Sequence, residues 1–127
     1  MVANPYQRYQ ENSIITTSGA GLTLMLYNGA IKFCNIAVED INKKNMEGAH
    51  KNIVKVQEII IELRATLNKK YPIALEMDQI YEYIYHCLVE GNITKDIQRV
   101  EEACTLIRSY RDAWQEAMKI AKNSNPN

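Results

Sequence analysis

The clearest indication of the fold is the stretch AHKNIVKVQEIIIELRATLN at residues 49–68. Apolar residues recur through it at alternating intervals of three and four, which is typical of a helix that packs along one face of a bundle. This seam consists of Met46, Ala49, Ile53, Val56, Ile60, Leu63 and Leu67. The three consecutive isoleucines at 59–61 exceed what one seam can bury, because successive side chains on a helix point about 100° apart.

Three other segments show a similar helical period. We expect helices from about Ser18 to Asn42, Met46 to Asn68, Ile73 to Glu90 and Thr94 to about Lys122. Gly91 and Asn92 would stop the third helix, and Thr94 would cap the fourth. Four helices of this length with short connections predict an all-α protein, an antiparallel up-down four-helix bundle.

The chain of 127 residues is long enough for one domain with a real core, and 46% of its residues are apolar. We expect residues 18–122 to form the bundle. Residues 1–17 are polar and would form an extended or short helical N-terminal cap segment, and residues 123–127 a frayed tail.

Charge and composition argue against several classes of protein. The 15 Lys and Arg residues balance 15 Asp and Glu residues, so the sequence gives no reason to expect nucleic-acid binding. No run approaches about 18 consecutive apolar residues and the N-terminus does not resemble a secretory signal, so we expect no membrane insertion. Cys34, Cys87 and Cys104 have apolar helical neighbours, which predicts reduced core cysteines in a cytoplasmic protein.

Signals of enzyme chemistry are weak. Glu47 and His50 have the spacing of half a carboxylate-bridged di-metal site, but no second copy of that pair exists, since Glu82 and His86 are four residues apart. The stretch SGAG at 18–21 lacks the ending of a phosphate-binding loop. We therefore expect no catalytic residue, no cofactor and no metal.

The second helix carries an apolar strip outside its seam. Ile61 lies about 100° from Ile60 and lines up with Val54 and Ala65. The strip has two interpretations, which can both hold: it is covered by the N-terminal segment, or it is an open groove for an amphipathic helix of another protein. The residues of the N-terminal segment that could cover it are Tyr6, Tyr9, Ile14 and Ile15.

Five stretches together resemble the family of flagellar secretion chaperones named FliS. They are NPYQRYQ at 4–10, LTLMLYNGAIKF at 22–33, AHKNIVKVQEIIIELRATLN at 49–68, YEYIYHCLVEGN at 81–92 and RDAWQEAMK at 111–119. The resemblance covers nearly the whole chain, and its most specific parts are the LTLMLY-x-GAI block and the N-terminal Tyr-x-x-Tyr. The chain departs from the family where Asn28 replaces a frequent Asp and Gly91 a frequent Ala.

The resemblance implies a four-helix bundle that acts as a bacterial cytoplasmic chaperone and not as an enzyme. Its client would be the C-terminal segment of flagellin, bound in hydrophobic grooves so that flagellin does not polymerise prematurely, and then delivered to the flagellar export apparatus. Tyr6 and Tyr9 would belong to a displaceable cap or to the client's edge. Tyr27 would lie at a groove wall with its hydroxyl in solvent, and Trp114 would fill the core.

Two alternatives remain open at this level. A generic helical-bundle adaptor would bind some other amphipathic helix through the same grooves. A bundle enzyme would need a metal centre. The sequence is compatible with a monomer or a weak dimer.

Overall fold

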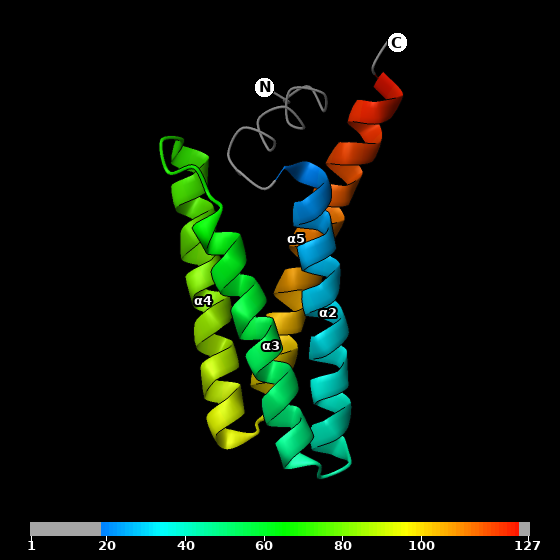
Figure 1. Cartoon of the computed structure of the whole chain (residues 1–127), viewed down its shortest axis with the longest axis vertical. Helices are drawn as coiled ribbons and strands as arrows, with labels where there is room; N and C mark the ends of the chain where they lie inside the picture. Colours follow the sequence, from blue (N-terminus) through cyan, green and yellow to red (C-terminus); the bar gives the residue numbers. More distant parts are fainter. Residues whose placement is uncertain (1–18, 125–127) are drawn as a thin grey trace.

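The computed structural model describes the backbone of residues 19–124 and the side chains of residues 19–117, 119 and 120. This part of the chain forms four helices: α2 (Ala20–Asn42), α3 (Met46–Ala65), α4 (Pro72–Thr94) and α5 (Ile97–Ser124). Each helix packs beside the next one along the chain, and α5 returns to pack against α2 (Figure 1). The predicted all-α class and antiparallel bundle are confirmed.

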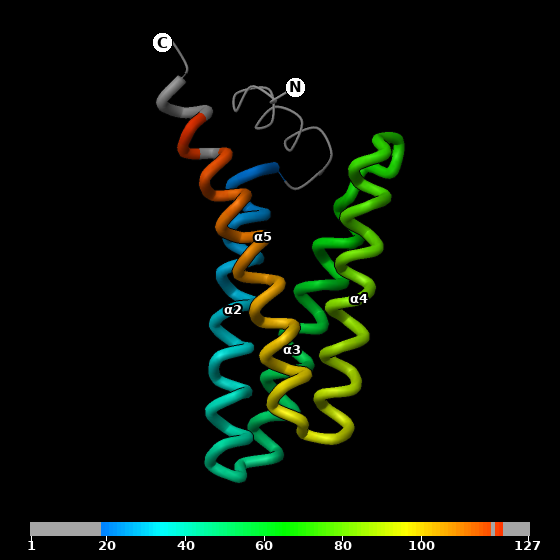
Figure 2. The backbone as a smooth tube through the Cα atoms, turned by 180° about the vertical axis from the view of Figure 1, so that it is seen from behind, coloured from blue at the N-terminus to red at the C-terminus, as the bar shows by residue number. Residues whose placement is uncertain are grey.

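The helices are closest at the end of the bundle that holds the α4–α5 turn. A Cβ atom placed on Gly91 would lie 2.7 Å from Cγ2 of Val100, so only glycine permits this approach of α4 to α5. Toward the opposite end, α3 and α4 diverge from α2 and α5, as both views show (Figures 1 and 2). We call this the open end; the N-termini of α2 and α4 lie there.

The seam of α3 forms the centre of the core. Its five central members, Ala49, Ile53, Val56, Ile60 and Leu63, are all buried. The flanking isoleucines differ: Ile59 is partly buried against the core, whereas Ile61 is 51% exposed. One seam therefore buries one of the three isoleucines completely.

Side chains from α2, α4 and α5 complete the core. Trp114 is buried as predicted, and its indole N–H donates a hydrogen bond to the carbonyl of Ala20 at 2.9 Å. Cys34, Cys87 and Cys104 are buried free thiols, which also agrees with the sequence prediction. The pKa of the Cys34 thiol is far above its usual value, because it hydrogen-bonds Cys104 and is buried.

The predicted end of the third helix is wrong. The helix continues through Gly91 and Asn92 to Thr94, and Lys95 ends it with a left-handed φ of 55°. Gly91 allows the close packing of α4 against α5 and does not end the helix.

Thr94 also does not cap the following helix, since its hydroxyl donates to the carbonyl of Glu90 at 2.9 Å. Asp96 has that role, because its carboxylate accepts a hydrogen bond from the backbone N–H of Gln98 at 2.9 Å.

The other helix boundaries are close to prediction. Helix α3 ends at Ala65, three residues earlier than expected, where the hydroxyl of Thr66 donates to the carbonyl of Leu63 at 3.0 Å. Helix α5 extends to Ser124, just past the expected end near Lys122. The expected cap of α2, Ser18, lies outside the described residues.

By length and composition alone, one helix of the described residues, α2, could cross a membrane, with a mean hydropathy of 1.2. The same test is passed by core helices of soluble proteins, so it is weak evidence. Tyr27, Ala30, Cys34 and Ala37 of α2 are buried in the bundle core, which accounts for much of this apolar character.

Candidate functional site

An open groove of about 620 Å³ lies between α4 and α5. We call it the α4–α5 groove. Its lining residues are Glu76, Gln79, Ile80, Tyr83, Glu102, Thr105, Leu106 and Tyr110. Ile80, Leu106 and Tyr110 are partly buried against the core and give the groove an apolar floor. The groove arises because Gly91 holds α4 and α5 together at one end while the helices separate toward the other.

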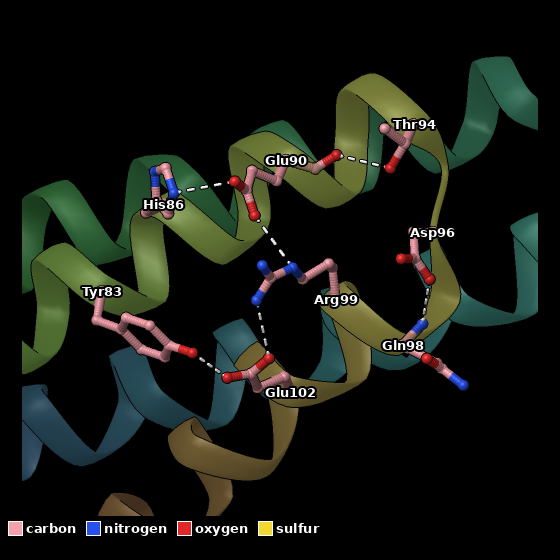
Figure 3. Close-up of polar contacts among 8 residues, drawn as sticks. All are labelled: Tyr83, His86, Glu90, Thr94, Asp96, Gln98, Arg99 and Glu102. Atoms are coloured by element: carbon pink, nitrogen blue, oxygen red, sulfur yellow. Dashed lines mark hydrogen bonds and ion pairs between the residues drawn. The ribbon is translucent and has the colours of Figure 1, made fainter.

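A polar cluster joins the two walls of the groove (Figure 3). The Tyr83 hydroxyl on α4 donates a hydrogen bond to the Glu102 carboxylate on α5. Arg99 on α5 pairs with Glu102 at 3.2 Å and with Glu90 on α4 at 3.0 Å. These contacts fix the orientation of the Tyr83 ring at the groove wall.

The pKa of Tyr83 is raised to about 12, mainly because its hydroxyl donates a hydrogen bond to Glu102. Tyr83 therefore remains a neutral hydrogen-bond donor at physiological pH. Tyr83 is 45% exposed, so a bound partner can contact it directly.

A second hollow lies between α3 and α4, and we call it the α3–α4 hollow. It is lined by Ile61, Arg64, Ala65, Lys69 and Asp78. A third hollow, which includes Arg64, Gln79 and Tyr83, connects it with the α4–α5 groove over the outer face of α4. The accessible surface is therefore continuous from Ile61 to the α4–α5 groove.

An ion pair fixes the α3–α4 hollow. Arg64 donates to both carboxylate oxygens of Asp78, at 2.9 and 3.3 Å. The Arg64 guanidinium is the main cause that lowers the pKa of Asp78 below its usual value. The bridge holds the start of α4 against the end of α3.

The predicted strip on α3 is present and largely accessible. Ile61 and Ala65 are exposed and line the α3–α4 hollow, and Val54 is partly exposed about two turns before Ile61. Tyr6, Tyr9 and Ile14 lie outside the described residues, so the interpretation that the N-terminal segment covers the strip stays a prediction.

The expectation for Tyr27 is wrong. Its side chain is 1% exposed and its hydroxyl forms a hydrogen bond with the hydroxyl of Tyr81, so it does not reach solvent. Burial raises the pKa of Tyr27 to about 12 and raises that of Tyr81 as well. The hydroxyl of Tyr81 on α4 offsets the cost of burying the Tyr27 hydroxyl, and no local sequence pattern indicates this pairing. Tyr27 supports the core near Ile80 and does not line the groove.

The sequence reasoning missed the four side chains that shape the α4–α5 groove: Ile80, Tyr83, Leu106 and Tyr110. Two spacings could have revealed them. Leu106 and Tyr110 are four residues apart on α5, and Ile80 and Tyr83 are three apart on α4. Neither pair indicates by itself that the two helices separate.

Large apolar side chains are also exposed near the open end. They are Leu22 and Met25 at the start of α2, and Tyr71, Ile73 and Leu75 at the start of α4. Since both helices begin at this end, these residues extend the apolar surface beyond the grooves.

Among the described residues, no group of three or more His, Cys, Asp or Glu side chains could hold a metal ion. Glu47 instead lies 3.5 Å from Lys51 in an exposed ion pair, and His50 hydrogen-bonds Asn92. The arrangement of the site is suited to binding an apolar segment.

Comparison with known proteins agrees with this description. Residues 2–121 match the family described as "Flagellar protein FliS". The chain is 40% identical over 118 residues to a flagellar secretion chaperone FliS of Bacillus subtilis (strain 168), covering 93% of this chain and 89% of that protein. It is 27% identical over 111 residues to the flagellar secretion chaperone FliS of Escherichia coli (strain K12), covering 85% of this chain and 82% of that protein. The chain therefore belongs to the FliS family of flagellar secretion chaperones.

Proposed function

We propose that this chain binds the C-terminal segment of a flagellin in the cytoplasm. Binding would prevent the flagellin from polymerising prematurely, and the complex would be delivered to the flagellar export apparatus. The observation that carries the proposal is the open α4–α5 groove, whose apolar floor of Ile80, Leu106 and Tyr110 is accessible in a folded bundle. An export chaperone needs such a surface, because its client must be held as an unassembled chain.

The continuity of the accessible surface supports an extended client. From Ile61 in the α3–α4 hollow, the surface passes Arg64 and Tyr83 and reaches the α4–α5 groove. A client that follows this path would contact the bundle at several small apolar sites. Each fully buried large aliphatic side chain contributes about 1.5–3 kcal/mol of binding free energy. Several such contacts together would offset the free energy that it costs to order a disordered segment.

Within this proposal, Val54, Ile61 and Ala65 contact the client directly. Tyr6, Tyr9 and Ile14 belong to a cap, formed by residues 1–17, that covers part of the same surface until the client displaces it. The protein acts as a monomer or a weak dimer.

A pair of exposed isoleucines tests the role of the α3–α4 hollow. Ile61 lies in the hollow, whereas Ile93 is 77% exposed near the end of α4 and lines none of the hollows described above. We expect Ile61→Asp to weaken binding of a flagellin C-terminal peptide at least tenfold, while Ile93→Asp leaves the affinity unchanged. Both variants should retain the far-UV circular dichroism of the parent. Equal affinities for the two variants would contradict the assignment of Ile61.

A further inference from the structure

The α4–α5 groove combines an apolar floor with acidic edges. Among the described residues that line the groove, the charged ones are Glu76 on α4 and Glu102 on α5, and both are acidic. A segment with apolar residues facing the floor would therefore place its flanking side chains beside carboxylates. The edge favours a partner with positive charge.

The carboxylate of Glu102 is held in place. Tyr83 donates to it from α4, and Arg99 bridges it to Glu90 (Figure 3). Two carboxylates thus share one guanidinium, which leaves one negative charge in excess at this end of the groove. His86 pairs with Glu90 at 3.0 Å and adds positive charge only when it is protonated.

Glu76 provides the second negative charge, toward the open end. It is exposed, and no ion pair to it occurs within the described part of the chain. Glu76 is seven positions before Tyr83, the residue that contacts Glu102, and this spacing corresponds to about 10 Å along α4. The two acidic edges are therefore about two helical turns apart.

The α3–α4 hollow differs in charge. Its lining carries two basic residues, Arg64 and Lys69, and one acidic residue, Asp78. Asp78 is already occupied by Arg64 at 2.9 Å and lies 4.0 Å from Lys69. With two cations and one carboxylate, the lining of this hollow is net positive, whereas the described charged residues that line the α4–α5 groove are both acidic. A cationic helix is therefore attracted to the groove and not to the hollow.

From these features we propose that the α4–α5 groove selects an amphipathic helix whose apolar stripe is flanked by two Lys or Arg residues, one on each side of the stripe and about two turns apart. The proposal rests on the proposed function, because it assigns this helix to the client's C-terminal segment. The two cations pair with Glu76 and Glu102 while the apolar stripe covers Ile80, Leu106 and Tyr110. The groove then fixes the register of the client, which an apolar floor alone would leave free to slide.

The test uses the full chain and two synthetic helical peptides with the same leucine stripe. One peptide carries Lys at two positions about two turns apart, one on each side of the stripe, and the other carries Glu at the same positions. By fluorescence anisotropy at low salt, the Lys peptide should bind about four- to twenty-five-fold more tightly than the Glu peptide, with about two- to fivefold from each exposed charge pair. High salt should remove most of this difference. Equal affinities of the two peptides would overturn the proposal.

Charge-reversed variants locate the effect. Glu76→Lys should abolish the preference for the Lys peptide, whereas Glu101→Lys, an exposed residue of α5 that does not line the groove, should preserve it. Identical behaviour of the two variants would place the selective charge elsewhere and refute the assignment. Both substitutions are at exposed positions, and circular dichroism confirms that each variant is folded.

A flagellin C-terminal peptide separates this inference from the proposed function. If that peptide binds the parent protein but is indifferent to Glu76→Lys, the register inference fails while the proposed function stands. If it does not bind while the Lys peptide binds in a Glu76-dependent manner, the proposed function fails and the groove still selects a basic helix.

Discussion

Truncation of two neighbouring isoleucines, Ile60→Ala and Ile61→Ala, separates the core of the bundle from its binding surface. Ile60 is 0% exposed, so its truncation removes three buried carbon atoms and leaves a cavity. At about 0.8 kcal/mol per buried methylene, plus a cavity term, the loss is about 3–4 kcal/mol. Ile61 is 51% exposed and solvent fills the space that its truncation leaves, so its loss is below about 1 kcal/mol.

Thermal unfolding measures both values. For a chain of this length, about 3–4 kcal/mol corresponds to a decrease of roughly 10–15 °C in Tm for Ile60→Ala, against a few degrees for Ile61→Ala. Far-UV circular dichroism reports the helices, and the fluorescence of the single tryptophan, Trp114, reports the packing of α5 against α2. Coincident transitions would justify a two-state treatment. Comparable destabilisation by the two substitutions would refute the reasoning, because Ile61 would then belong to the core.

Three further predictions concern polar groups. Burial raises the pKa values of Tyr27 and Tyr81, so above about pH 10 the unfolded chain releases protons that the folded chain retains. The free energy of unfolding should therefore fall by up to about 1.4 kcal/mol per pH unit for each tyrosine. In denaturant titrations at alkaline pH, the double variant Tyr27→Phe/Tyr81→Phe should show a smaller decline. The Arg64 guanidinium lowers the pKa of Asp78, so the ion pair stabilises the fold by up to about 1 kcal/mol above about pH 4, and this stabilisation is lost as the pH falls through the folded-state pKa. The difference in Tm between the parent and Asp78→Asn should therefore vanish near pH 2. A difference that does not change with pH would argue against the ion pair. Trp114→Phe leaves the carbonyl of Ala20 without its indole donor and removes packing, and should cost about 1–3 kcal/mol. Native-state hydrogen exchange should show the largest increase at the first hydrogen-bonded amides of α2, from Thr23 onward, and a uniform increase would contradict the local role of the bond.

The core was largely predictable because it depends on local periodicity. The intervals of three and four from Ala49 to Leu63 identified the buried face of α3, and that face is buried in the structure. The helix ends were less predictable. Gly91 resembles a helix stop in the sequence, but the close approach of Val100, which belongs to another helix, determines its role.

The candidate site was predicted only in part, for a related reason. Ile61 and Ala65 could be identified from the helical wheel, since their exposure depends only on the direction in which they point around a single helix. The α4–α5 groove depends on the angle between two helices, and no residue of α4 or α5 alone specifies that angle. Tyr27 illustrates the same limit, because Tyr81, located 54 positions away, provides the partner that permits its burial.

The acidic edges of the α4–α5 groove would affect which register of a client the groove binds. Apolar contacts provide affinity but little discrimination between registers. In the proposed binding mode, Glu76 and Glu102 would add charge at two fixed points, so a client would be bound moderately tightly and still in one register. Moderate affinity would also suit the proposed release of the client at the export apparatus.

Calorimetric titration of the full chain with a peptide from the C-terminus of a flagellin tests the central claim most directly. A peptide of about 40 residues is suitable, because it could cover about 60 Å as helix and so reach more than one groove. We predict 1:1 binding with a micromolar or lower Kd, together with more helical circular dichroism in the mixture than in the separate components. No heat of binding over a range of temperatures, together with no gain in helix while the bundle remains folded, would contradict the claim that the exposed apolar surface binds flagellin.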